Sequence, residues 1–199
     1  RAKANWDKIH FGDPNPYAKL PRLNIFTYDL GNLLPKYADE DLAFNFHEFF
    51  RVNADGQFIH EKDVHSFLNL ISKKDEESNY PYSTDEYRDY FRHSLWMVPG
   101  VKEARALSTM LKKHPVFSQF TIVNVAGEGD EEEANEDALK KVQKAIGKHP
   151  EETYTITLSC GRLTMGVSVP AWTAVFMLSG SYNTSAASYM QTIFRVQTP

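Results

Sequence analysis

The sequence predicts an α/β protein whose core is a mostly parallel β-sheet with helices on both faces. From His93 onward, apolar runs of strand length alternate with segments whose apolar residues recur at helical spacing. This alternation is typical of strands joined by helical crossovers. The composition agrees, because 42% hydrophobic and 24% charged residues are close to globular averages. The composition makes disordered, collagen-like and disulfide-rich classes improbable.

Charge and cysteine content limit the partners and the cellular compartment that we expect for the protein. The 199 residues carry 22 basic and 26 acidic groups, a net charge of −4. Nucleic-acid modules that act alone are usually basic, so a nucleic-acid role requires a local site or a partner domain. The single cysteine agrees with a reducing compartment, and we expect a cytoplasmic location. No apolar run approaches the roughly 20 residues of a membrane span, so we expect no membrane partner.

The first half of the chain predicts a connector followed by an irregular region. Prolines and glycine in residues 1–22 interrupt any long helix, so this stretch is predicted to be an interdomain linker. Residues 23–28 are rich in β-branched and aromatic residues and are followed by Gly31, which predicts a strand. Residues 42–92 predict an inserted α+β layer, with a β-hairpin over 48–60, a helix over 61–73 and a second helix from the capping-box motif at Ser83 to about Arg92.

The second half of the chain has the regular pattern. Its predicted strands cover 94–98, 120–125, 155–158 and 173–178, and its predicted helices cover 101–114, 135–146 and 185–196. Parallel strands joined by right-handed crossovers bring their carboxyl ends to one edge. Ligands bind at this edge in open α/β sheets, so the segments that follow the strands are the places to search for a site.

Three short patterns are weak candidates for chemistry. The Gly-x-Gly of residues 127–129 lacks a third glycine and is surrounded by acidic residues, which favours a structural turn over a phosphate cradle. His60 and His65 are five residues apart, about 140° around a helix, so they cannot share a metal ion. No metal site is predicted. Cys160 ends a strand and is interpreted as a buried small hydrophobe.

The last forty residues hold a more specific pattern. Thr164-x-Gly166-Val-x-Val169-Pro170 follows a predicted strand, and Gln191-x-x-x-Arg195 lies on the final predicted helix. These segments resemble the fifth and sixth conserved motifs of superfamily 2 helicases and translocases. The residues of these segments are most similar to those of helicase-like subunits of type I and type III restriction systems and of related phage or plasmid proteins. The resemblance implies a second RecA-like domain built from 23–41 and 93–199.

The resemblance also implies roles for individual residues. Arg195 would act as an arginine finger on the transition state of ATP hydrolysis, because a guanidinium is planar, multidentate and always charged. Gln191 would contact the nucleotide from one turn earlier. Arg162, Thr164 and Gly166 would contact nucleotide or DNA backbone. The sequence departs from the sixth motif at two positions, with Phe194 in place of its glycine and Thr198 in place of its second arginine.

Cofactors and partners follow from what the sequence lacks. It contains no Gly-x-x-x-x-Gly-Lys-Ser/Thr phosphate loop. We therefore expect the chain to be a fragment that alone binds no cofactor and hydrolyses no ATP. ATP and Mg²⁺ would be held by a preceding RecA-like domain in the full-length protein. Duplex DNA and a nuclease or methylase domain or subunit are the other expected partners. The alternative is a non-catalytic α/β interaction or regulatory module.

Overall fold

The computed structural model describes residues 14–15, 18, 23–26, 35–37, 44–74, 80–127, 132–160, 169–179 and 192. These residues contain a four-stranded sheet in the order β2-β3-β1-β4, in which every neighbouring pair is parallel. The strands are β1 (His93–Met97), β2 (Thr121–Asn124), β3 (Thr155–Ser159) and β4 (Ala174–Met177). The predicted α/β class is confirmed, and each strand predicted after His93 is present within two residues of its expected ends.

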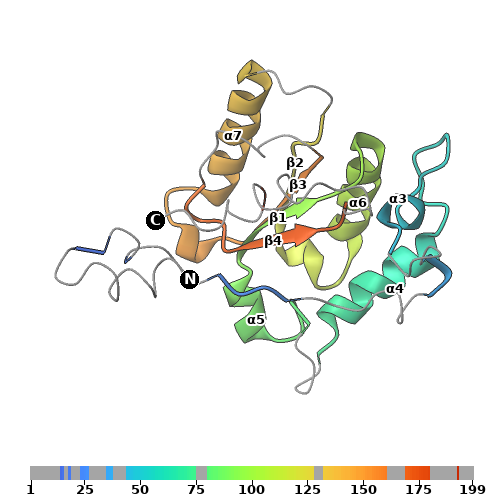
Figure 1. Cartoon of the computed structure of the whole chain (residues 1–199), viewed down its shortest axis with the longest axis horizontal. Coiled ribbons are helices and arrows are strands. Elements are labelled where there is room, and N and C mark those ends of the chain that lie inside the picture. Colours follow the sequence, from blue (N-terminus) through green and yellow to red (C-terminus); the bar gives the residue numbers. More distant parts are fainter. Residues whose placement is uncertain are drawn as a thin grey trace.

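Two helices cover opposite faces of this sheet (Figure 1). Helix α6 (Val101–Lys113) follows β1, and helix α7 (Glu132–Ile146) follows β2. Because side chains alternate along a strand, each face receives every second residue. Trp96, Ile156 and Leu158 belong to the core under α6, whereas Leu95 and Val123 belong to the core under α7.

The strand order explains why the helices lie on opposite faces. The chain moves from β1 past β3 to reach β2, and then returns to β3. Right-handed crossovers that run in opposite directions must pass over opposite faces of the sheet. The last crossover, from β3 past β1 to β4, runs in the same direction as the one that contains α7. Its residues Val169 and Trp172 accordingly pack in the α7-side core.

An additional helical layer extends the core beyond α6. It contains α3 (Phe46–Phe49) and α4 (Glu61–Ser72), whose buried aromatic and aliphatic side chains join the cluster that includes Trp96 and Leu107. Helix α5 (Asp85–Tyr90) buries none of its residues and precedes β1. Short 3₁₀ turns complete the described elements: η1 (Pro35–Tyr37), η2 (Phe117–Gln119) and η3 (Pro150–Glu152). None of the described residues of 42–92 pairs with the parallel sheet.

The hairpin predicted over 48–60 is wrong in its first arm. Residues 46–49 form the helical turn α3, because Asn45 caps it by accepting the Glu48 N–H at 3.0 Å and Phe49 buries its ring. What remains of the hairpin is one antiparallel bridge between Val52 and Phe58. Gly56 closes the intervening turn at φ 76°, a left-handed conformation that glycine adopts without steric cost.

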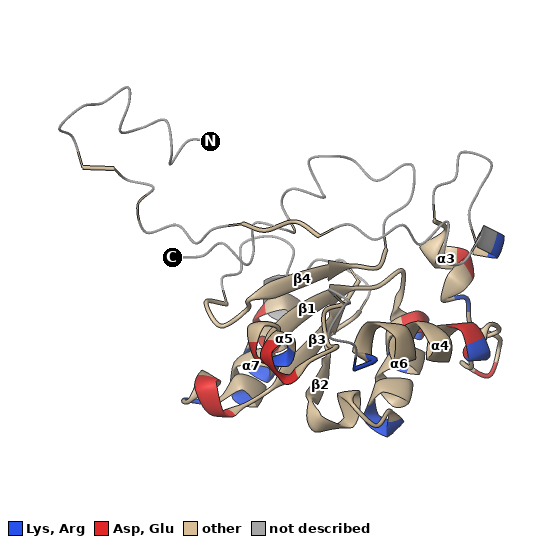
Figure 2. Cartoon of the chain, turned by 90° about the horizontal axis from the view of Figure 1, so that it is seen from below, with Lys and Arg blue, Asp and Glu red and all other residues tan. Residues whose placement is uncertain are grey.

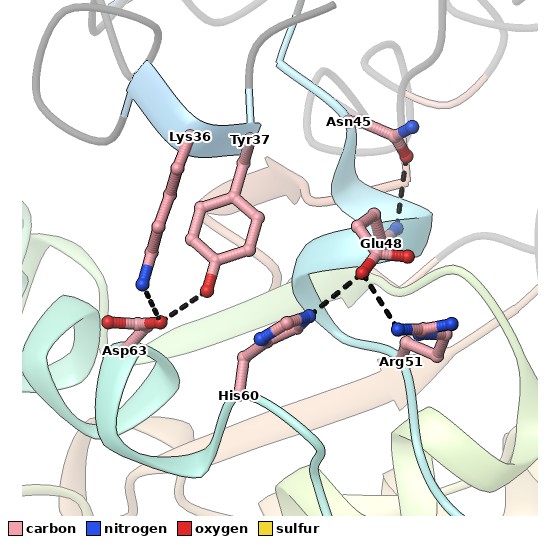
Figure 3. A network of polar contacts seen from close by, with 7 residues as sticks. All are labelled: Lys36, Tyr37, Asn45, Glu48, Arg51, His60 and Asp63. Atoms are coloured by element: carbon pink, nitrogen blue, oxygen red, sulfur yellow. Dashed lines mark hydrogen bonds and ion pairs between the residues drawn. The ribbon is translucent and has the colours of Figure 1, made fainter.

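Charged groups fasten this layer together (Figure 3). The Asp63 carboxylate of α4 accepts from both Lys36 and the Tyr37 hydroxyl of η1. Glu48 of α3 contacts His60 Nε2 at 2.9 Å and Arg51 at 3.1 Å. The two donors at Asp63 favour its ionised form and lower the pKa of this carboxyl. Figure 3 therefore shows η1 and α3 both joined to the start of α4, through Asp63 and His60.

The predicted strand near the start of the chain and the predicted helix near its end have different outcomes. The described part of the predicted strand 23–28, residues 23–26, lies outside any strand, and Ile25 and Phe26 are 60% and 58% exposed. The predicted helix 185–196 lies outside the described residues except for Thr192, which is helical and buried. Among the residues that the structure describes, no helix has the length and apolarity to cross a membrane.

Candidate functional site at the carboxyl edge of the sheet

The strand order creates one topological switch point at the carboxyl edge of the described sheet. The neighbouring strands β1 and β3 are followed by elements on opposite faces: β1 leads into α6, whereas Val169 and Trp172 after β3 pack on the α7 side. Open α/β sheets bind ligands at such a switch point. It lies between residues 98–100, which follow β1, and Ser159 and Cys160 at the end of β3.

Backbone hydrogen bonds hold the strands in register up to this edge. The Val98 N–H donates to Ser159 O at 2.8 Å, and the Leu178 N–H donates to Met97 O at 2.8 Å. The Val125 N–H donates to Leu158 O at 3.0 Å. All four strands thus end together, and the segments that leave them start from fixed positions.

Glu103 is a feature of this edge that the sequence analysis missed. Its carboxylate folds back over the start of α6, where a Cβ atom added at Gly100 would lie 2.3 Å from Glu103 Oε2. A carboxylate in the first turn is stabilised by the positive end of the helix dipole. A phosphate bound at the start of α6 would have to displace Glu103. The signal was present, because a Gly N-cap followed three residues later by Glu is a recognisable helix start.

The segment after β3 is anchored on both sides. Before it, Cys160 packs against the α6-side core as a small hydrophobe, and it is half-buried instead of buried as predicted. After it, Val169 and Trp172 are 4% and 2% exposed beneath α7. The Thr173 N–H then donates to His93 O at 2.9 Å, which starts β4. The described residues on either side of 161–168 are therefore held in place, Cys160 at the end of β3 and Val169 in the core.

The predicted site residues themselves lie outside the described residues. This holds for Arg162, Thr164 and Gly166 in the segment after β3, and for Gln191 and Arg195 near the end of the chain. Of the final helical segment the structure describes only Thr192, whose side chain is buried. The proposal that these residues converge on one exposed rim stays a prediction.

Charge is distributed unevenly along the sequence. All 26 acidic residues precede Thr153, whereas the remaining stretch carries Arg162 and Arg195 as its charged side chains. Arginine presents a planar fork of donors suited to phosphate oxygens.

Two buried histidines are structural groups outside this site. His93 accepts from Thr155 Oγ1 at Nδ1 (2.9 Å) and donates from Nε2 to Pro150 O (2.7 Å). His114 accepts the Val116 N–H at Nδ1 (3.2 Å) and donates from Nε2 to Asn69 Oδ1 (3.0 Å). Burial disfavours the imidazolium and lowers the pKa of both rings. Both rings are therefore satisfied in the neutral form.

The weak candidates of the sequence analysis have ordinary surroundings. His60 contacts Glu48, whereas His65 Nδ1 accepts from Asn69 at 2.9 Å, so the two rings have separate partners. After β2, Asn124 Oδ1 accepts the Ala126 N–H at 3.0 Å and shapes the turn that leads to Gly127. The rest of the Gly-x-Gly turn, including Gly129, lies outside the described residues.

Comparison with known proteins gives one informative similarity. No protein-family model matches the chain, and no solved structure matches it. The chain is 28% identical over 210 aligned positions to a Mycoplasma pneumoniae (strain ATCC 29342 / M129) protein. That protein is described provisionally as the C-terminus of a type II restriction enzyme and methyltransferase, RM.MpnORF110P. The alignment covers 92% of this chain but only 28% of the relative's length. The chain is thus similar, along nearly its whole length, to one part of a restriction–modification protein.

Proposed function

We propose that this chain is the second RecA-like domain of an ATP-dependent DNA translocase or helicase that works in a restriction–modification system. The observation that carries the proposal is the strand order, which sets β1 and β3 side by side and creates a switch point at their carboxyl ends, where α/β sheets bind ligands. The residues that resemble the fifth helicase motif follow β3 in the sequence. The similarity to a restriction enzyme and methyltransferase supports the setting in DNA restriction.

In this proposal the chain supplies one wall of an ATP site. The opposite wall, with a phosphate loop and the Mg²⁺ ligands, belongs to a preceding domain, since this chain has no phosphate-loop sequence. Arg195 acts across the cleft on charge that develops on the γ-phosphate, and Gln191 orients the nucleotide beside it. Thr164 and Gly166 contact the DNA backbone through a hydroxyl and backbone donors, and Arg162 adds a charged contact.

We expect the two ligands to be coupled through the sheet. Residues 161–168 connect β3 to Trp172 in the α7-side core, so DNA bound at Thr164 would act on the sheet. This arrangement suits a motor in which DNA binding stimulates hydrolysis.

The proposal is tested with the full-length protein in a steady-state ATPase assay, with and without duplex DNA. We expect hydrolysis that duplex DNA stimulates. We expect Thr164→Ala to remove most of the stimulation while leaving the basal rate unchanged, and Thr109→Ala on the exposed surface of α6 to serve as the control. A protein that hydrolyses no ATP under either condition would favour the non-catalytic interaction module instead.

A further inference from the structure

A strip of lysines follows the outer face of α7. Ala138, Val142 and Ile146 are buried against the sheet, so they fix the inner face of the helix. At about 100° per residue, Lys144 falls on the opposite side and Lys141 on the adjoining flank, about 60° away from Lys144. Both are exposed, as is Lys148 just beyond the helix end. Figure 2 shows basic positions along this helix.

These lysines are available to an outside partner. Lys140 lies 3.8 Å from Glu136 and 3.5 Å from Asp137, so its charge is partly compensated. Among the described residues, Lys141, Lys144 and Lys148 have no ion pair. In a protein of net charge −4, residues 138–149 hold four lysines and no acidic residue, which makes this half of α7 locally positive up to the exposed Glu151 and Glu152.

Helix stability explains only part of this pattern. Cations stabilise the negative end of a helix dipole, but this effect is limited to the last turn. Lys144 lies in that turn, whereas Lys141 precedes it and Lys148 follows Gly147, which ends the helix at φ 78°. The spacing suits a polyanion instead, because Lys141 and Lys144 are separated by about 4.5 Å along the axis. One strand of duplex DNA presents a phosphate about every 3.4 Å.

We propose that the strip Lys141–Lys144–Lys148 is a second contact for the backbone of duplex DNA, separate from the carboxyl edge. Helix α7 runs from the end of β2 back to the start of β3, so its basic half lies toward the amino ends of the strands. The strip would hold DNA without reading sequence, since lysine contacts to phosphate carry no base information. This inference rests on the proposed function for the identity of its partner.

The test is equilibrium binding of the whole chain to a fluorescent duplex of random sequence, over about 50 to 200 mM salt. Each lost phosphate contact lowers the slope of log K against log salt by about 0.9. We therefore expect the triple variant Lys141→Gln, Lys144→Gln, Lys148→Gln to have a slope smaller by about 2.7. The matched control replaces Lys102, Lys112 and Lys113 of α6, which are equally exposed but lie over the other face, and we expect it to keep the wild-type slope.

The outcomes separate this inference from the proposed function. Equal losses in the α7 and α6 variants would reduce the effect to net charge and overturn the inference. An unchanged slope in the α7 variant, with weaker binding by Arg162→Gln, would overturn the inference and leave the carboxyl-edge contact in place. Absence of duplex binding by the unmodified chain would contradict both. Tight binding of the strip to acidic protein surfaces but not to DNA would identify a different partner and refute the inference as well.

Discussion

Three buried polar side chains form a triangle of hydrogen bonds in the α6-side core. The Tyr82 hydroxyl lies 3.0 Å from Ser94 Oγ, and Trp96 Nε1 donates to both oxygens, at 3.2 and 3.1 Å. All three residues are 0% exposed. Burial raises the pKa of the Tyr82 phenol and so favours the protonated hydroxyl. Each of the three groups has a hydrogen bond to both of the others.

Single substitutions should remove bonds without leaving the indole alone. Tyr82→Phe keeps the ring that packs on Phe117 at 5.0 Å and on Phe176 at 5.5 Å, and it removes two hydrogen bonds. At about 1 kcal/mol for each net bond, the expected loss of unfolding free energy is about 2 kcal/mol. Ser94→Ala also removes two bonds and should cost about as much. In either variant Trp96 Nε1 still donates to the remaining oxygen.

The double variant should expose the penalty of an orphaned donor. With both hydroxyls absent, the buried indole N–H has no acceptor in the triangle, which costs about 1–3 kcal/mol beyond the lost bonds. Repeating the cycle in a Trp96→Phe background removes this penalty. The coupling free energy between Tyr82→Phe and Ser94→Ala should therefore be more unfavourable by about 1–3 kcal/mol when the indole is present. Urea unfolding followed by circular dichroism, with equal m-values, measures each corner. Identical coupling in both backgrounds would refute the orphaned-donor reasoning.

Three further predictions concern stability. Burial lowers the pKa of His93 and His114, so below the ordinary histidine pKa of 6.5 the unfolded chain binds more protons than the folded one. The free energy of unfolding should therefore fall on acidification from pH 6.5, by at most about 1.4 kcal/mol per pH unit for each ring. Urea midpoints measured against pH should depend less on pH when both histidines are replaced by Gln. Gly147→Ala should cost about 1–2 kcal/mol, because φ is 78° there, and Gly147→Asn should cost less; equal thermal shifts would contradict this strain argument. Thr157→Val should stabilise the protein by about 1 kcal/mol, because Thr157 Oγ1 is buried and has no hydrogen-bond partner in the described part of the chain. A lower denaturation midpoint would contradict this and show that the hydroxyl makes a stabilising hydrogen bond.

The regular half of the fold was predictable because local pattern and tertiary burial agree there. Strand β3 reads as an apolar and β-branched run, and both of its faces are covered in the structure. Helix α4 has Val64, Phe67, Leu68 and Ile71 on one side, and these are the residues that it buries. Where a segment's own periodicity coincides with its burial, sequence is sufficient.

The irregular half was harder because single residues decide it. Phe49 and Phe50 resemble a strand in sequence, but the Asn45 cap and the surrounding aromatic rings favour one helical turn. Residues 23–26 have strand-like composition, yet Ile25 and Phe26 stay exposed, so composition alone did not supply a pairing partner. The predicted N-cap at Ser83 is wrong by one position, because Thr84 accepts the Tyr87 N–H at 3.1 Å and is the N-cap of α5.

The candidate site divides in the same way. The parallel strands that flank its loop were predictable, and the strand order confirms them, whereas the loop 161–168 lies outside the described residues. The switch point could not be predicted from sequence, because it depends on β3 being inserted between β1 and β2. Glu103 was missed because a first-turn carboxylate is common, and only the fold brings it to the carboxyl edge of the sheet.

The most direct measurement for the central claim is DNA-stimulated ATP turnover by the full-length protein carrying Arg195→Ala. A finger acts on charge that forms in the transition state, so kcat should fall by about 10³ or more while nucleotide binding stays within a few-fold of the unmodified protein. Arg195→Lys should restore little of the rate, because a point charge cannot replace the planar fork. Near-normal turnover by Arg195→Ala would contradict the account and leave Arg195 as a helix-end arginine with no part in hydrolysis.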